Sequence, residues 1–315
     1  MARHVIVGAG TNGSQLAELL VGRGEEVVLV SRRGRGPDRP GITCRPVDAA
    51  DAGALGAAAE GASVLYNCAN PDYLRWQTDW PPMARAMLEV AERSGAVLVT
   101  LSNLYGYGPV AGPMTEDLPL AAVSTRGQVR AQMWRDALAA HEAGRIRCVE
   151  VRASDFFGPG LTDQGYLGER AVPRILAGKT VRAIGDVDAP HSWTYVPDTV
   201  EALALVGSEE AAWGRPWHVP TAPARSIRQM VTAMANAAGV QPSRVSGVSR
   251  GVLRALGIVS AQMRGLAEVA YQFEHPFIVD SSAFTDRFGV AATPVDDAVG
   301  ATVAWWRTRL AAPGR

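Results

Sequence analysis

HVIVGAGTNG (residues 4–13) predicts a short buried strand that runs directly into a G-x-G-x-x-G turn. Apolar residues then recur at helical spacing over residues 14–22, and VVLV (residues 27–30) predicts a second parallel strand. The order strand, glycine turn, helix, strand is that of a dinucleotide-binding unit. An ordinary glycine-rich turn is the alternative, and the complete unit around the turn argues against it.

Each residue of the turn has an expected task. Gly8 permits the tight turn, Gly10 lets the backbone approach a pyrophosphate, and Gly13 lets the helix pack closely on the strand. Thr11 and Asn12 stand at the start of the helix, where free backbone N–H groups bind phosphate. We therefore expect these five residues to hold the diphosphate of a nucleotide cofactor.

Strand and helix patterns alternate through the first half of the chain. Pro81 and Pro82 suit a helix start. Strands are expected over residues 41–47, 63–68, 96–101 and 146–152, and helices over residues 49–60, 83–94 and 127–142. The alternation predicts an α/β fold, a Rossmann-type doubly wound parallel sheet with a smaller C-terminal substrate lobe.

A change of pattern marks the expected domain boundary. Glycine and proline become dense at residues 157–160, and short helices mixed with loops follow. We expect an NAD(P)-binding Rossmann domain over residues 1–160 and a mainly substrate-binding lobe over residues 161–315, with residues 191–205 returning to the first domain.

The charge balance favours a small-molecule partner. Lys+Arg and Asp+Glu both number 31, so the net charge is zero and no basic field is expected to gather nucleic acid or anionic membrane. No apolar run reaches the length of a membrane span, and no charged and apolar leader precedes the first strand. We expect a cytoplasmic protein.

The three cysteines, Cys44, Cys68 and Cys148, are widely spaced and form no C-x-x-C pair. This pattern fits reduced, structural thiols rather than a disulfide framework or a zinc site. We therefore expect no metal site.

Four further motifs point to one superfamily: YNCAN (66–70), SNLYG (102–106), VRASDFFGPG (151–160) and HSWTYVPD (191–198). Together with the glycine turn they resemble the extended short-chain dehydrogenase/reductase superfamily, which contains NAD(P)-dependent epimerases, dehydratases and reductases. The resemblance spans nearly the whole chain. It implies a nicotinamide dinucleotide cofactor and a small-molecule substrate.

The resemblance also assigns cofactor contacts after the predicted strands. It implies that Asp48 lies near the adenine and that Ala69 and Leu101 line the nicotinamide ribose, with Cys68 and Asn70 in the same loop as Ala69. For Asp48, a helix N-cap before residue 49 is an equally good interpretation.

The sequence departs from the superfamily at its catalytic pair. Members that move hydride carry a tyrosine and, four residues later, a lysine, because a free phenol titrates near ~10 and needs a neighbouring cation to work near neutral pH. Here the corresponding helix contains STRGQVRA (124–131), with no tyrosine and with Arg130 near the lysine position. The only lysine is Lys179. Arginine supplies charge to the ribose region, but its guanidinium does not release a proton.

Other side chains are therefore candidates for proton transfer. Ser102 lies at or within one residue of the superfamily's Ser/Thr that binds a substrate carbonyl, and Tyr105 follows the same strand. Asp155 aligns with an asparagine that faces substrate in many relatives, and a carboxylate there could act as a general base. The structural alternatives are a strand cap for Ser102, packing for Tyr105 and loop stabilisation for Asp155. We expect Ser102, Asp155 and Arg130 around the nicotinamide.

Aromatic and basic residues are the candidate substrate contacts. Tyr73 and Trp76 belong to an aromatic segment (73–80) that either walls the pocket or packs on the body of the protein. Phe157 lies in the crevice loop. His191 stands where nucleotide-sugar enzymes often carry an arginine for the substrate diphosphate, which weakens a nucleotide-sugar interpretation.

The second strand ends in Ser31, Arg32 and Arg33, where an NAD-preferring site usually has an acidic residue for the ribose 2′-hydroxyl. A hydroxyl and guanidinium groups suit a 2′-phosphate, so NADP is favoured over NAD. A solvated arginine loop is the alternative.

Three functions follow. The leading hypothesis is an NADP-dependent oxidoreductase that acts on a small organic metabolite with an atypical proton donor. The second is an epimerase, dehydratase or isomerase that uses its nucleotide internally or structurally, and the third is a non-catalytic NADP(H) sensor. A homodimer through residues 83–94 and 127–142 is a further expectation.

Overall fold

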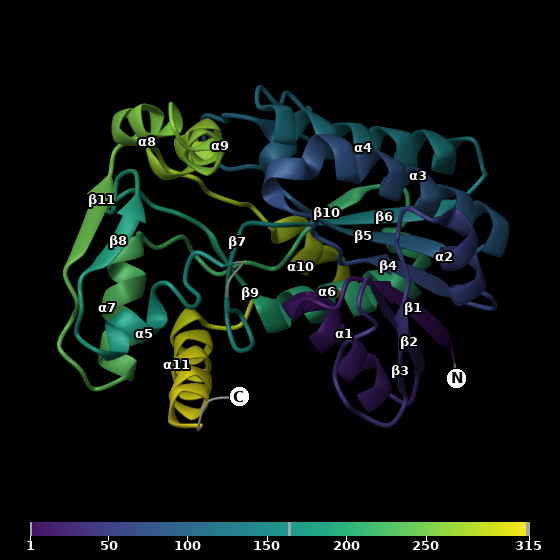
Figure 1. Cartoon of the computed structure of the whole chain (residues 1–315), viewed down its shortest axis with the longest axis horizontal. Coiled ribbons are helices and arrows are strands. Elements are labelled where there is room, and N and C mark those ends of the chain that lie inside the picture. The colour runs from purple at the N-terminus through teal and green to yellow at the C-terminus, as the bar shows by residue number, and fades with distance from the viewer. Residues whose placement is uncertain (1, 163–164, 313–315) are drawn as a thin grey trace. The chain divides into compact units, whose positions relative to one another are not determined.

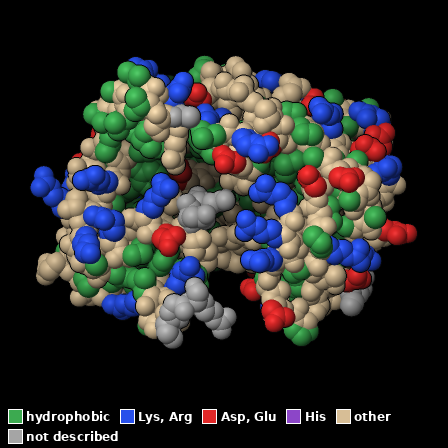
Figure 2. Space-filling model, viewed as in Figure 1, with side chains coloured by type: hydrophobic (Ala, Val, Ile, Leu, Met, Phe, Trp, Pro, Cys, Tyr) green, Lys and Arg blue, Asp and Glu red, His purple; other side chains and the backbone are tan. Residues whose placement is uncertain are grey.

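The computed structural model describes residues 2–162 and 165–312, apart from the side chain of residue 261. The chain divides into two compact units, each described below by itself (Figures 1 and 2). Unit 1 contains residues 1–108, 119–153 and 199–217, and unit 2 contains residues 109–118, 154–198 and 218–315. The cofactor and substrate roles expected of the two parts of the chain stay predictions.

Unit 1 is built on a seven-stranded sheet with the order β10-β6-β5-β4-β1-β2-β3. Every neighbouring pair from β6 to β3 is parallel, which confirms the predicted Rossmann-type fold. The strands are β1 (Arg3–Val7), β2 (Glu26–Ser31), β3 (Ile42–Pro46), β4 (Val64–Asn67), β5 (Val97–Asn103), β6 (Arg147–Ala153) and β10 (Pro216–His218).

Helices cover both faces of this sheet (Figure 1). On one face lie α2 (Ala52–Ala58), α3 (Trp76–Ser94) and α4 (Thr125–Glu142), which share a buried core with β1, β2 and β5. The other face carries α1 (Thr11–Gly22) and α6 (Val196–Ser208). The α6 helix lies so close to the sheet that a side chain at Gly207 would collide with the Tyr66 phenol.

Two predicted helix starts in unit 1 are wrong. The α3 helix begins at Trp76, so Pro81 and Pro82 lie inside it and not at its start. The α2 helix begins at Ala52, where Asp51 is the N-cap and accepts hydrogen bonds from the N–H groups of the second and third helical residues. Asp48 is therefore not a helix cap.

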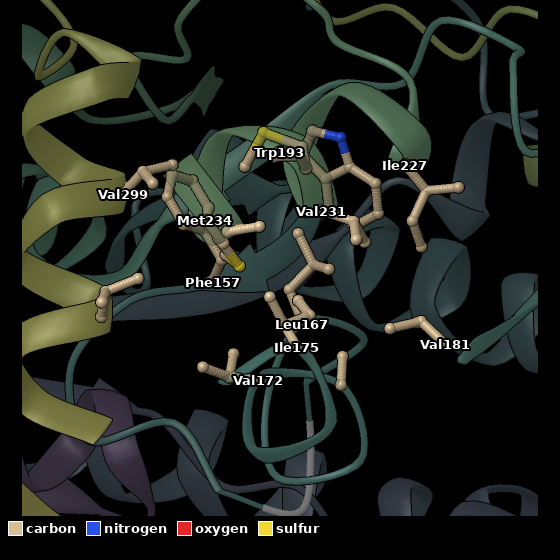
Figure 3. Packing of buried hydrophobic residues seen from close by; sticks show 14 of the residues in the cluster. Phe157, Leu167, Val172, Ile175, Val181, Trp193, Ile227, Val231, Met234 and Val299 are labelled. Carbon is tan, nitrogen blue, oxygen red and sulfur yellow. The ribbon is translucent and has the colours of Figure 1, made fainter. Parts of the chain in front are cut away.

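Unit 2 has two small parallel sheets, β7 with β9 and β8 with β11. Its core joins β8 and β9 to α5, α7 and α11, and Figure 3 shows Phe157, Leu167 and Met234 pointing toward one another inside it. The elements are β7 (Asp155–Phe157), α5 (Val172–Leu176), β8 (Val181–Ile184), β9 (Trp193–Tyr195), α7 (Ile227–Ala237), β11 (Val245–Val248), α8 (Arg250–Gly257), α9 (Ala261–Val269), α10 (Ser282–Phe288) and α11 (Val295–Ala311).

Candidate functional site

The glycine turn of unit 1 has three different environments. Gly8 has a φ of +106°, and an added Cβ there would lie 2.6 Å from the Cys68 carbonyl oxygen. A Cβ at Gly13 would collide with the carbonyl oxygen of Gly8, whereas a Cβ at Gly10 would meet no atom within 4 Å. The turn therefore closes on itself at Gly8 and Gly13 and leaves open space at Gly10, as a backbone that receives a pyrophosphate requires.

The first turn of α1 fits an anion. Gly10 is the N-cap and has no side chain, and the first turn contains no acidic residue. The free N–H groups of this 12-residue helix carry partial positive charge. Asn12 Oδ1 is buried and meets no hydrogen-bond donor within residues 2–162 and 165–312. Such an orphaned polar atom at a helix start fits a site for a hydrogen-bonding ligand.

The predicted adenine end lies beside the turn. The Gly8 N–H donates to Val30 O at 2.9 Å, which places the end of β2 next to the glycines. Ser31 Oγ lies 3.2 Å from both N and O of Arg35. Arg32 and Arg33 are exposed and have no acidic partner in the described part of the chain. Asp48 Oδ1 accepts a hydrogen bond from Ala50 N–H.

The ends of β4 and β5 reach the same region of unit 1. Cys68 and Ala69 abut Gly8, and Asn70 is exposed in the following loop. Burial raises the pKa of the Cys68 thiol to about 12, so the thiol stays protonated, as expected of a structural cysteine. Ser102 is buried in β5, beside Arg152 in β6.

An aromatic–arginine cluster surrounds Arg130, the residue expected near the superfamily's lysine position. Its members are Tyr73, Trp76, Trp80, Tyr105, Arg126 and Arg130. Arg130 lies 4.7 Å from the Trp80 ring and Arg126, four residues earlier on α4, lies 4.2 Å from the Tyr73 ring. The ring centres of Trp76 and Tyr105 are 5.9 Å apart. The segment 73–80 is thus helical, and both tryptophans are buried.

Arg130 is a buried cation with limited freedom. Only 5 % of it is exposed, and its Nη2 donates to Leu101 O at 2.6 Å. Burial lowers the pKa of Arg130 to about 10, a shift to which the neighbouring Arg152 also contributes, while Glu150 acts in the opposite direction. The guanidinium therefore remains charged at neutral pH, stabilised by a carbonyl and by aromatic faces.

In unit 2, Asp155 and His191 form a close pair. His191 Nε2 lies 3.0 Å from Asp155 Oδ2, and His191 Nδ1 lies 3.2 Å from Gln272 O. The imidazole stacks on Phe273 and Phe277, with ring centres at 4.8 and 5.2 Å. The His191 side chain is 4 % exposed and that of Asp155 is 27 % exposed, so Asp155 is the member of the pair that solvent reaches.

Both ring nitrogens of His191 face oxygen acceptors. Nδ1 faces the Gln272 carbonyl and Nε2 faces the Asp155 carboxylate. A neutral imidazole has one N–H, so each tautomer donates to one of these two acceptors. The tautomer of His191 therefore sets which of the two oxygens receives a hydrogen bond.

The remaining predicted substrate residue, Phe157, is 2 % exposed and packs against Tyr195 in the unit 2 core. Sequence reasoning missed Gln272, Phe273 and Phe277, which lie some eighty positions after His191 and carry no local signal. It also missed a buried ion pair in unit 1, Arg152 Nε to Glu150 Oε2 at 2.6 Å, with Arg152 Nη1 donating to the Tyr107 hydroxyl. Two opposite charges inside an apolar strand were the available signal.

Residues 4–219 match the model of the NAD dependent epimerase/dehydratase family. The chain belongs to that family. It is 28% identical over 212 residues to the UDP-glucose 4-epimerase of Mycolicibacterium smegmatis, a match that covers 61% of this chain and 66% of that relative, just under two thirds of its length.

The chain is also similar to the dTDP-6-deoxy-L-talose 4-dehydrogenase (NAD(P)(+)) of Kitasatospora kifunensis. The two sequences are 26% identical over 262 residues, a match that covers 78% of this chain and 81% of the relative. The fold of the present chain is similar to that of a dTDP-glucose 4,6-dehydratase from Bacillus anthracis in complex with NAD, with a TM-score of 0.79 and 16% identity. The match covers 98% of this chain and 97% of the other.

Among the helices of residues 2–162 and 165–312, none is long and apolar enough to cross a bilayer.

Proposed function

We propose that unit 1 binds a nicotinamide dinucleotide at the glycine turn and that the enzyme uses it to act on a hydroxyl or carbonyl group of a small organic metabolite. The observation that carries the proposal is the open space at Gly10 between two closed glycine positions. The orphaned Asn12 Oδ1 and the family membership support it. When bound, the nicotinamide supplies hydride transfer.

For the cofactor, NADP is proposed over NAD. Arg32 and Arg33 stand at the end of β2 without an acidic neighbour that would select a free 2′-hydroxyl. The K. kifunensis relative is named for NAD(P)(+), whereas the B. anthracis neighbour is in complex with NAD. The proposed preference therefore depends on the arginines of this chain.

The Asp155–His191 pair is the proposed proton donor and acceptor. Asp155 keeps Oδ1 for a substrate hydroxyl, because Oδ2 is engaged by His191. When a substrate hydroxyl becomes a carbonyl, its proton passes to Asp155; the reverse step returns it. His191 is a positioning residue in this scheme, while Ser102 and Tyr105 are proposed substrate contacts in unit 1 and Arg130 stabilises the end of β5.

A second candidate is a reaction without net redox change, in which the nucleotide is reduced and reoxidised within one turnover. Its support is the likeness to a UDP-glucose 4-epimerase. Sugar nucleotides are then the first substrates to try. Turnover that needs stoichiometric NADPH favours the leading function, and turnover unaffected by added cofactor, with nucleotide retained through purification, favours the second.

Calorimetric titration of nucleotide-stripped protein with NADP⁺, NADPH, NAD⁺ and NADH tests the cofactor proposal. Gly10→Trp is designed to block the site, since a Cβ at this position would meet no protein atom within 4 Å. Arg32→Ala with Arg33→Ala should weaken NADP(H) binding by about tenfold per lost charged hydrogen bond and leave NAD(H) unchanged. Arg85→Ala, an exposed arginine on α3, is the matched control. If no nucleotide binds, or if Gly10→Trp binds as well as the natural protein, the proposal is wrong.

A further inference from the structure

Although the net charge of the whole chain is zero, one of its segments is strongly basic. Residues 211–267 contain seven arginines and no aspartate or glutamate. Residues 211–217, which include Arg215, belong to unit 1. The other six arginines lie in unit 2, where the segment forms α7, β11, α8 and most of α9. The charge balance of the whole sequence therefore says little about this part of the surface.

Three of these arginines have acidic partners. Arg225 pairs with Asp296, Arg228 with Asp188, and Arg250 with Glu274. Arg244, Arg254 and Arg264 are exposed, and none of them has an ion pair with another residue of the described chain. The uncompensated charge therefore collects around the α8–α9 hairpin.

The same hairpin exposes aliphatic side chains. Val252 and Leu256 are 49% and 47% exposed on α8, and Ile258 and Val259, between the two helices, are 82% and 87% exposed. We call these four residues the α8–α9 tip. They are four of the seven exposed large hydrophobic residues of the described chain, gathered within eight positions. Figure 2 shows hydrophobic side chains gathered over α8 and α9. Single exposed aliphatic residues are ordinary, but such a group marks an interaction site.

The hairpin itself explains why the tip points outward. Its own core is small: Leu253, Ala267 and Ala270 are its buried members. A Cβ at Gly257 would lie 3.1 Å from the backbone of Arg264, so the two helices touch closely there and leave no room for the tip between them. The aliphatic side chains are thus held away from the hairpin's interior.

We propose that the α8–α9 hairpin docks on an anionic phospholipid surface. Branched aliphatic side chains without polar groups enter the boundary between headgroups and acyl chains, and the flanking Arg254 and Arg264 reach the phosphates. The hairpin contains one acidic residue, Glu268 near the end of α9, against the arginines at 250, 254 and 264, so an anionic surface attracts it. A tip of four side chains is also small against the roughly 800 Å² per partner of a stable protein interface.

Flotation of the full chain with lipid vesicles tests this proposal. We expect binding to phosphatidylcholine vesicles that contain phosphatidylglycerol, weakening as salt rises, and little binding to pure phosphatidylcholine. Ile258→Ser with Val259→Ser should reduce partitioning about tenfold or more, and Arg254→Gln or Arg264→Gln about fivefold each. Val123→Ser, at an exposed valine of unit 1, and Arg85→Gln are the controls, and circular dichroism checks that each variant folds.

Three results would overturn the proposal: no binding to anionic vesicles, equal binding by the Ile258/Val259 variant, or equal loss in the two controls. Self-association that the Ile258/Val259 variant abolishes, without vesicle binding, would assign the surface to a second copy instead.

Discussion

Replacing His191 by phenylalanine is the sharpest test of the Asp155–His191 pair. The new ring keeps an aromatic face toward Phe273 and Phe277 but has no ring nitrogens. The change therefore removes the polar contacts to the Gln272 carbonyl and to the Asp155 carboxylate.

The size of the effect follows from burial. A neutral hydrogen bond contributes about 0.5–1.5 kcal/mol and one to a charged group about 1.5–3 kcal/mol. Gln272 is 3% exposed, so its carbonyl loses its donor without recovering water, whereas the partly exposed Asp155 can be rehydrated. We expect His191→Phe to lower the free energy of unfolding by about 2 to 4 kcal/mol, and Asp155→Asn, which keeps an oxygen acceptor, by about 1 to 2 kcal/mol.

Urea unfolding of the two variants and of their combination gives a double-mutant cycle, with His275→Phe, at an exposed histidine of unit 2, as the control. A coupling energy within about 0.5 kcal/mol of zero would refute a stabilising hydrogen bond between His191 and Asp155.

Two further predictions concern unit 1. Arg130→Met should destabilise the protein by about 1 to 3 kcal/mol, because the Leu101 carbonyl loses its donor. Arg130→Lys should recover part of that loss, since it keeps the charge. The urea midpoints of both variants check this, and midpoints equal to each other would contradict it. The thiol of Cys68 should resist iodoacetamide up to about pH 9, because burial raises its pKa from 9.0 to about 12. The unfolded thiol releases its proton from about pH 9 and the folded thiol only near pH 12, so the free energy of unfolding should fall between these pH values. This fall should be smaller in Cys68→Ala. Rapid labelling of the folded protein at pH 8 would contradict the prediction, because it would show that the thiol is accessible.

The sequence determined the fold of unit 1 and the place of the proposed nucleotide site. Glycine at residues 8, 10 and 13 is a local requirement of backbone conformation and close approach, and alternating short apolar runs and helical periods define a parallel sheet without knowledge of distant contacts. The absence of the Tyr-x-x-x-Lys pair was also a property of sequence alone. The start of α3 was missed because tertiary packing of Trp76 and Trp80 extends the helix through two prolines that local propensity would place at its start.

Only the tertiary structure decided the surroundings of the candidate catalytic groups. His191 was predicted to contact substrate, but Gln272, Phe273 and Phe277 enclose it and direct Nε2 to Asp155. That Arg130 lies near a ribose stays a prediction, and only the structure shows that Trp80 and the Leu101 carbonyl contact its guanidinium. The physical reason is the same for both residues. The orientation of a buried side chain depends on the donors, acceptors and ring faces around it, and these come from segments far apart in the chain. The hydrophobic periodicity of the sequence carries no information about such distant contacts.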